Sequence, residues 1–424
     1  MFKILRNAFK VKDLRKRILF TLFIVVVFRA GNFIPIPGIN TESLKQLTST
    51  GLFGFYDLIS GGALERFSIF ALGVVPYINA SIIVQLLSMS ISKFEQLSKE
   101  GEEGRKKLQN ITRYLSIFLA FVQSYGTYLL ISNVGAIEDR SIFSLVFIIV
   151  TLVTASTLLV WIGDQVSLHG IGNGVSLFIF VNIVSRFPTM FIQIDALQKA
   201  GEVGLIEIAI FSVVAIGLLI WTIYMNLAER RVIVQYAGKQ LSDKNANNQA
   251  HIPFSITGSA VIAIIFATSV LQFPATIGAF FSQDAWINRV LVNGTYSPFR
   301  INSTLYILLF SFLIVFFTWF YTQVTYKPDE MAENMNKSAG FIPGIRPGEA
   351  TARYIERILD RISIIGGVFG AILALFPIFM DLFTPFRGLQ FGGTMLLILI
   401  GTSADTMRQI ESQLILRHYQ GFLK

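Results

Sequence analysis

The chain has 424 residues, of which 53% are hydrophobic and only 14% are charged, and its 35 Lys and Arg outnumber 26 Asp and Glu to give a net charge of +9. An average soluble domain is about 25% charged, and a water-soluble fold of this length has no core large enough for so much apolar side chain. Composition therefore argues against a soluble enzyme, a disordered chain and a free nucleic-acid-binding protein. The sequence has no cysteine, which excludes disulfides, thiolate metal sites and a cysteine nucleophile.

Ten apolar stretches are long enough to cross a bilayer, whose core of about 30 Å needs about 20 residues in a helix. The first, about 18–35, is interrupted only by Arg29 and lacks a signal-peptide cleavage site, so we expect it to be retained. The other nine are predicted at 67–92, 114–137, 141–163, 165–185, 208–228, 252–283, 301–326, 362–380 and 388–404. The sequence therefore predicts an all-α polytopic membrane protein with ten transmembrane helices.

Basic residues are concentrated in alternate connections. The N-terminal arm 1–17, the connections 93–113, 229–251 and 327–361, and the tail 405–424 hold 26 of the 35 Lys and Arg. Cytoplasmic loops of membrane proteins carry such an excess, so both termini are predicted to be cytoplasmic. The two long connections at 229–251 and 327–361 are where we expect a cytoplasmic partner to bind, although long loops without a partner would give the same pattern.

Ionisable residues are absent from the middles of nine spans, where an ion-coupled transporter would need them. The chain has neither a G-x-x-x-x-G-K-[ST] nor an H-E-x-x-H motif, and its three histidines are scattered. Gly170–Gly174 resembles half a dinucleotide fingerprint, but it opens an apolar span and is better explained as a helix-start turn. We therefore expect no enzymatic activity, no metal and no cofactor, and a passive pathway lined by apolar and uncharged polar groups.

The apolar pattern breaks between Gly51 and Leu87. Residues 51–66 are too short and too interrupted by glycine to span a bilayer, yet a full span follows them directly. A broken helix is tolerated at membrane depth only where protein or water surrounds it. The sequence therefore predicts a re-entrant element inside a cavity.

The run 61–87, preceded by Ser60, resembles the second-helix signature of the SecY family. Further motifs of that family follow in its order over nearly the whole chain: Ile34–Gly38, Gly101–Arg105, Gly170–Gly174, Phe273–Ile277, Pro343–Glu349 and Phe391–Thr394. The resemblance implies two pseudo-symmetric five-helix halves, 18–190 and 206–404, around an hourglass pore, with an external connection at 191–205. No repeat between the halves is visible in the residues themselves.

The resemblance also implies a function. SecY-family proteins are channels that move unfolded secretory polypeptides across the bacterial plasma (inner) membrane. They release membrane segments into lipid through a lateral gate, here between the second and third and the seventh and eighth spans. From the residues alone, an ion-coupled secondary transporter with inverted repeats stays open as the alternative. An intramembrane enzyme is a weaker third reading.

The family's pore ring and plug map onto matching positions. The ring at the waist would consist of six apolar residues: Ile78, Ile82, Ile179, Ile183, Ile265 and Ile398. An apolar constriction of this kind dewets and excludes ions. The plug, about 55–67, would include Asp57, Ser60, Gly61, Gly62, Ala63 and Leu64, with the two glycines acting as a hinge; an interfacial helix is the alternative interpretation.

The lateral gate and the docking surface are expected at other polar positions. Uncharged polar residues inside the spans, which would line the gate or form ordinary interhelical hydrogen bonds, are Asn79, Gln85, Gln123 and Thr268. The expected docking residues are Lys239, Lys244 and Arg346, although the loop after Lys239 is less basic than is typical of the family. The implied partners are SecE-type and SecG-type small membrane subunits, a SecA-type motor ATPase, the ribosome, signal peptides, nascent chains and membrane lipids.

Overall fold

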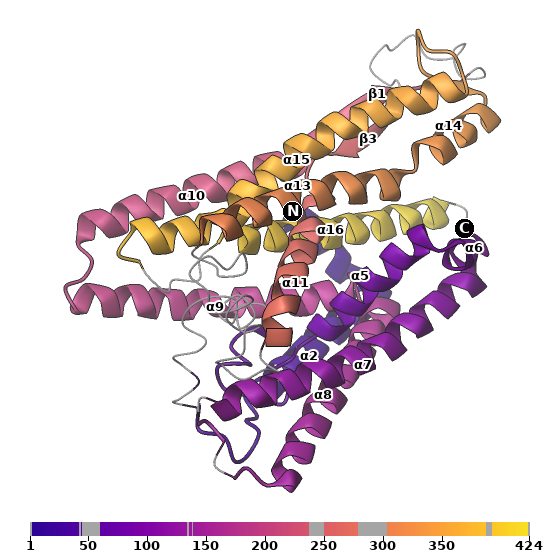
Figure 1. The fold of residues 1–424 in the computed structure, drawn as a ribbon. Helices are drawn as coiled ribbons and strands as arrows, with labels where there is room; N and C mark the ends of the chain where they lie inside the picture. Colours follow the sequence, from indigo (N-terminus) through magenta and orange to yellow (C-terminus); the bar gives the residue numbers. More distant parts are fainter. Residues whose placement is uncertain are drawn as a thin grey trace.

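The computed structural model describes residues 2–41, 44, 60–133, 135–137, 139–236, 250–278, 303–386 and 392–422. Helices dominate it, and the strands are short (Figure 1). The helices up to residue 199 are α1 (Phe2–Lys10), α2 (Lys12–Gly31), α5 (Val75–Ser90), α6 (Ser92–Lys99), α7 (Glu102–Asn133), α8 (Ile142–His169) and α9 (Gly174–Lys199). Those that follow are α10 (Leu205–Leu227), α11 (Ala260–Gly278), α13 (Thr304–Tyr326), α14 (Pro328–Lys337), α15 (Glu349–Phe383) and α16 (Gly393–Phe422).

Each of the ten predicted spans overlaps a helix of the structure, in order α2, α5, α7, α8, α9, α10, α11, α13, α15 and α16. Within the described residues, length and hydropathy alone qualify six helices to cross a bilayer. A seventh qualifies if α5 and α6, which are bent by 100° at their junction, count as one span. The chain is a multi-pass, mostly helical membrane protein.

In three of the predicted spans the helix begins later than we expected. The helix of the second span begins at Val75, because residues 61–74 form successive turns. The fifth begins at Gly174, because α8 continues to His169 and Asn173 caps α9 by accepting a hydrogen bond from the Ser176 amide. The seventh begins at Ala260, because the preceding residues 251–255 form a strand.

The four strands that the described residues form lie in the two long hydrophilic connections. β1 (Glu229–Ile233) pairs antiparallel with β3 (His251–Ser255), and β2 (Gln235–Tyr236) pairs antiparallel with β4 (Gly340–Phe341). The second pairing joins the connection after α10 to the connection before α15. Val232, Phe254 and Ile355 pack there in a shared apolar cluster. The two connections thus form one folded unit, at the upper right of Figure 1.

The membrane helices form two groups (Figure 1). Helices α2, α5, α7 and α8 pack with one another through α5–α7, α7–α8 and α2–α8 contacts, and α10, α13, α15 and α16 lie on the other side. Helix α9 packs against both α8 and α16, so it joins the groups along one edge. Helix α11 runs between them and contacts α13, α15 and α16 as well as α5 and α7.

Candidate functional site

The six predicted ring residues come from four helices, and none of them is exposed. Those on α9 and α16, together with Ile82 of α5, are buried, whereas Ile78 of α5 and Ile265 of α11 are half-buried. Ile78 packs against two apolar clusters at once. One contains Ile82 and Ile265; the other contains Ile179, Ile183 and Ile398. Side chains from both helix groups therefore meet around Ile78.

This waist carries no titratable group among its six side chains, so it can neither transfer a proton nor hold a metal. Its chemistry is exclusion: a narrow passage lined by hydrocarbon is poorly wetted and opposes ions. In the part of the chain that the structure describes, no cluster of three or more His, Asp or Glu is placed to hold a metal ion. The arrangement suits a barrier that opens mechanically.

The predicted plug lies inside the molecule where it is described. Ser60, Gly61, Gly62, Ala63 and Leu64 are all buried, and Asp57 lies outside the described residues. Gly61 and Gly62 have φ of +70° and +86°, a region that side chains strongly disfavour. Ser60 is helical, and the described residues 61–66 that follow it form turns.

Four polar side chains surround this segment, and the sequence reasoning assigned none of them to a site. Arg29 at the end of α2 donates from Nη1 to the Gly61 carbonyl at 3.1 Å. Arg186 of α9 pairs with Glu65 at 3.4 Å. Asn32 donates from Nδ2 to Asn182 Oδ1 of α9 at 3.0 Å. Two features of the sequence could have pointed to these residues: Arg29 is the one charge within the first span, and Asn182 is an amide within the fifth.

At the predicted gate, Asn79 forms a hydrogen bond with Ser269, a residue that the sequence analysis did not assign to the gate. Ser269 Oγ of α11 donates to Asn79 Oδ1 of α5 at 2.7 Å. Thr268 is buried, and its hydroxyl donates to carbonyls of its own helix, Ile264 at 3.0 Å and Ile265 at 2.8 Å. Asn79 therefore links two helices, whereas Thr268 is satisfied locally.

The two predicted glutamines of the gate differ from Asn79. The Gln123 side-chain carbonyl is buried without a hydrogen-bond partner among the described residues. Gln85 is half-buried on α5. Among the described residues, neither glutamine side chain forms a hydrogen bond to another helix, so the polar contact between α5 and α11 rests on Asn79 and Ser269.

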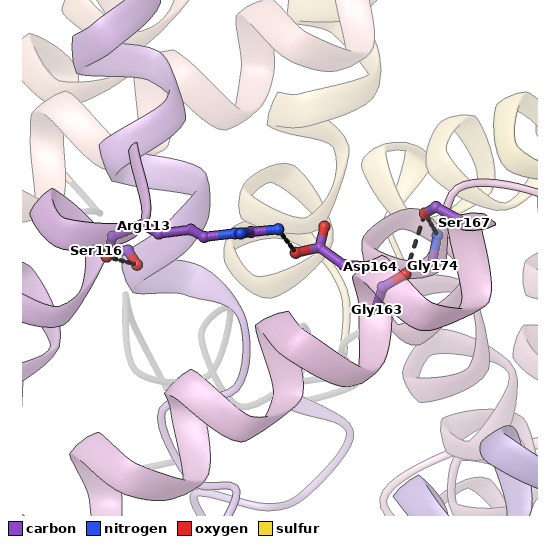
Figure 2. Close-up of polar contacts among 6 residues, drawn as sticks. All are labelled: Arg113, Ser116, Gly163, Asp164, Ser167 and Gly174. Carbon is purple, nitrogen blue, oxygen red and sulfur yellow. Dashed lines mark hydrogen bonds and ion pairs between the residues drawn. The ribbon is translucent and has the colours of Figure 1, made fainter. Parts of the chain in front are cut away.

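A charged contact ties the helix next to the gate to its neighbour (Figure 2). Arg113 of α7 donates from Nη2 to Asp164 Oδ2 of α8 at 2.6 Å. On the same stretch of α8, Ser167 donates to the Gly163 carbonyl and accepts from the Gly174 amide, both at 3.0 Å. These bonds join α7 to α8 and α8 to the first residue of α9.

Of the predicted docking residues, Arg346 falls on the unit formed by the two long connections. Arg346 is exposed between β4 and α15, and its carbonyl accepts from Thr351 Oγ1 at 2.9 Å. This bond shapes the loop from within the first turn of α15. Lys239 and Lys244 lie outside the described residues.

An apolar waist between two helix groups, with the buried segment 60–64 and the α5–α11 contact beside it, is typical of a polytopic channel. Residues 68–407 match the SecY family. The chain is 40% identical to the protein translocase subunit SecY of Halalkalibacterium halodurans and 39% identical to those of Bacillus subtilis and Aquifex aeolicus, covering all of each chain in all three alignments. The chain belongs to the SecY family and is a channel subunit of a protein translocase.

Solved structures share the fold. A structure described as a protein-conducting channel superposes with a TM-score of 0.69 at 19% identity, over 95% of this chain and 93% of the other. A second, whose description concerns a plug domain that stabilises the closed state of the SecY channel, gives 0.68 at 16% over 95% and 92%. Sec61 in the canine ribosome–channel complex gives 0.63 at 18% over 95% and 93%.

Proposed function

We propose that unfolded secretory polypeptides cross the membrane through the waist formed by Ile78, Ile82, Ile179, Ile183, Ile265 and Ile398. The observation that carries this proposal is the meeting of these side chains around Ile78 from four helices of both groups. Branched apolar side chains yield to a passing chain by changing rotamer and offer it no specific hydrogen bonds. They therefore suit a passage that must admit many sequences yet exclude ions when empty.

Residues 60–66 act as the plug that closes this passage at rest. The burial of residues 60–64 beside α2 and α9, and the two positive-φ glycines, support a folded element that is compact but able to change conformation. When a polypeptide enters, the plug moves aside. The chain itself carries out no chemical step in this scheme, so the energy for transport comes from its partners.

Membrane segments leave sideways through the seam between α5 and α7 on one side and α11 and α13 on the other. The contact of α11 with α5 and α7 is narrow compared with its contact with α13. The Ser269–Asn79 bond crosses this seam. A segment inside the channel then partitions into lipid when its own hydrophobicity exceeds the cost of parting these helices.

Halves of five helices, 18–190 and 206–404, joined through 191–205, would turn relative to each other during this opening. The placement that fits is a bacterial plasma membrane with both termini in the cytoplasm. In this orientation the unit formed by β1–β4, α14 and the start of α15 faces the cytoplasm. Arg346 lies exposed on it, and we expect Lys239 and Lys244 to belong to the same surface.

That surface is where a SecA-type motor ATPase or a ribosome would dock, while SecE-type and SecG-type subunits would pack against exposed helix faces within the membrane. Two related folds support a ribosome partner: the canine Sec61 complex and a yeast Ssh1 complex whose description places it on the 80S ribosome, with a TM-score of 0.63. Signal peptides, nascent chains and lipids would meet the protein at the seam.

Reconstitution tests the function directly. Vesicles containing the chain with its small membrane subunits should protect a secretory precursor from external protease when motor and ATP are supplied, and not without them. An ion-coupled carrier would instead take up a small solute along an imposed ion gradient with no motor present. Gradient-driven uptake without precursor protection would overturn the proposal.

A further inference from the structure

The segment between α2 and α5 is held in two different ways. Residues 67–74 are fixed by backbone bonds: the Ile36 amide donates to the Phe67 carbonyl and the Ile69 amide to the Ile34 carbonyl, both at 3.0 Å. Ser156 of α8 adds a hydrogen bond to the Gly73 carbonyl at 3.0 Å. The Phe67 side chain is fully buried. This part is built into the wall of the channel.

The backbone bonds of residues 60–66 run within the same turns, where the Ala63 and Leu64 carbonyls accept from the Ser68 and Phe67 amides. Long polar side chains connect this part to α2 and α9. The Arg29 guanidinium reaches the Gly61 carbonyl, and the Arg186 guanidinium reaches the Glu65 carboxylate. A methyl group added at Gly61 would lie 2.5 Å from Asn182 Oδ1, and one at Gly62 would lie 3.3 Å from the Arg186 guanidinium. The backbone of this part therefore lies directly against α9. Leu64 adds an apolar contact.

We propose that Arg29, Asn182 and Arg186 form a polar latch that holds residues 60–66 closed, and that this part turns about Phe67 while residues 67–74 stay in place. The inference rests on the proposed function, because a latch has meaning only if residues 60–66 are a plug. Phe67 has φ +45°, which is unusual for a bulky residue. It marks the junction between the gripped part and the anchored part.

Polar bonds suit a contact that must break repeatedly. Water can replace the bonds of guanidinium and amide groups as they open, so each bond adds only a modest net stability. Asn32 holds the Asn182 side chain from behind, which orients the amide that faces Gly61. The latch thus holds residues 60–66 in one position and adds only moderate stability to the closed state.

The latch is attached to α2 and α9, and neither helix belongs to the proposed seam. Parting α5 and α7 from α11 breaks the Ser269–Asn79 bond but leaves the bonds of Arg29 and Arg186 intact. The plug is therefore released by the entering polypeptide itself and does not follow automatically from opening of the gate. This separation would keep the membrane sealed while a signal segment samples the seam.

Ion leak without substrate is the first readout. Arg29→Gln and Arg186→Gln should each raise the leak through reconstituted channels about tenfold, which is the effect of losing one charge-assisted hydrogen bond. Arg140→Gln is the matched control, since Arg140 donates to the Ser132 carbonyl at 2.9 Å in an exposed position. Deletion of residues 60–66 gives the reference value, the ion leak of a channel without its plug.

These variants separate the inference from the function on which it rests. If the deletion leaks strongly but Arg29→Gln and Arg186→Gln match Arg140→Gln, the latch is wrong while the plug stands. If the deletion does not leak, residues 60–66 are not a plug, and the proposed function fails with the latch. Equal leak in all three arginine variants would also overturn the latch.

Disulfides test the position of the hinge, because the natural chain has no cysteine. Pro35 and Ser68 face each other in an antiparallel bridge, a spacing that a disulfide can span. Oxidising a Pro35→Cys/Ser68→Cys chain should leave precursor transport unchanged. Oxidising Gly61→Cys/Asn182→Cys should stop transport, with recovery on reduction. Loss of transport in the first pair, or full transport in the oxidised second pair, would overturn the hinge at Phe67.

Discussion

Residues 60–66 and the seam between α5 and α11 border the same waist, but different contacts close them. The proposed plug segment is held by the guanidinium groups of Arg29 and Arg186 and lies against the Asn182 amide of α9. The seam is a narrow contact between helices with the Ser269–Asn79 hydrogen bond across it. Sealing against ions and sideways release can therefore be adjusted by different residues.

The largest increase in ion leak should come from filling the space at Gly61. Gly61→Ala would place a methyl group 2.5 Å from Asn182 Oδ1 and would hold a side chain at φ +70°. The left-handed backbone alone costs about 1–2 kcal/mol, and the contact adds to it. We expect this variant to leak ions more than either arginine variant, in planar-bilayer recordings without substrate.

Gly38→Ala is its control. Gly38 has φ +83°, but nothing lies within 4 Å of an added methyl group. It therefore carries the backbone cost without the contact. A leak in Gly38→Ala as large as that in Gly61→Ala would mean that general destabilisation, and not loss of the fit against α9, opens the pore.

A change at the seam should alter which precursors are transported and leave the ion leak unchanged. Ser269→Ala removes the bond to Asn79, worth about 1 kcal/mol, and should let precursors with less hydrophobic signal segments be transported, without raising the ion leak. Thr268→Val is the matched control, since its hydroxyl bonds within its own helix. An equal gain in both variants, or a leak in Ser269→Ala, would contradict the separation between seam and plug.

The Arg113–Asp164 pair should affect stability more than transport. Arg113 is 43% exposed and Asp164 is 16% exposed, so solvent screens the pair and we expect a loss of about 1 kcal/mol for Arg113→Gln. Thermal unfolding in detergent, with Asp164→Asn and the double variant completing a cycle, measures the coupling. Lys106→Gln, which breaks an exposed pair with Glu102, should lower the stability less. An equal loss of stability would show that the Arg113–Asp164 pair has no special role.

The smallest effect is a pH dependence on α6. A hydrogen bond from Lys99, together with its charge, lowers the pKa of Glu95. A lowered carboxyl pKa stabilises the fold above the ordinary value, and this stabilisation is lost as the pH falls through the lowered value. The difference in unfolding temperature between Glu95→Gln and the natural chain should therefore be slight at neutral pH and vanish in acid. A difference that grows in acid would contradict the assignment.

The helices could be predicted because an apolar run of about 20 residues without charge is typical of a membrane-spanning helix. Their ends could not, since a helix continues past the membrane wherever its next turns are merely polar. Helix α7 starts at Glu102 and α15 at Glu349, each 12 or 13 residues before the predicted apolar stretch at 114 or 362. The strands β1 and β3 were missed because their pairing joins residues far apart in the chain.

The site was predictable to the extent that family motifs mark it. The ring, plug and gate positions came from resemblance, and their roles stay predictions that the experiments above address. The latch could not be found this way. Arg186 counts in the sequence as one of the few basic residues on the outer side, and its partner Glu65 lies 121 residues away. Only the fold brings α2, α9 and the segment before α5 together.

The central claim is that a translocating polypeptide passes between the isoleucines of α5 and α9. Because the natural chain has no cysteine, single cysteines at Ile82 and Ile183 can be tested for crosslinks to a cysteine in a stalled secretory precursor. The account predicts crosslinks at both positions and none at Ile142, which is 83% exposed on the outer face of α8. Crosslinks confined to Ile142 would contradict it.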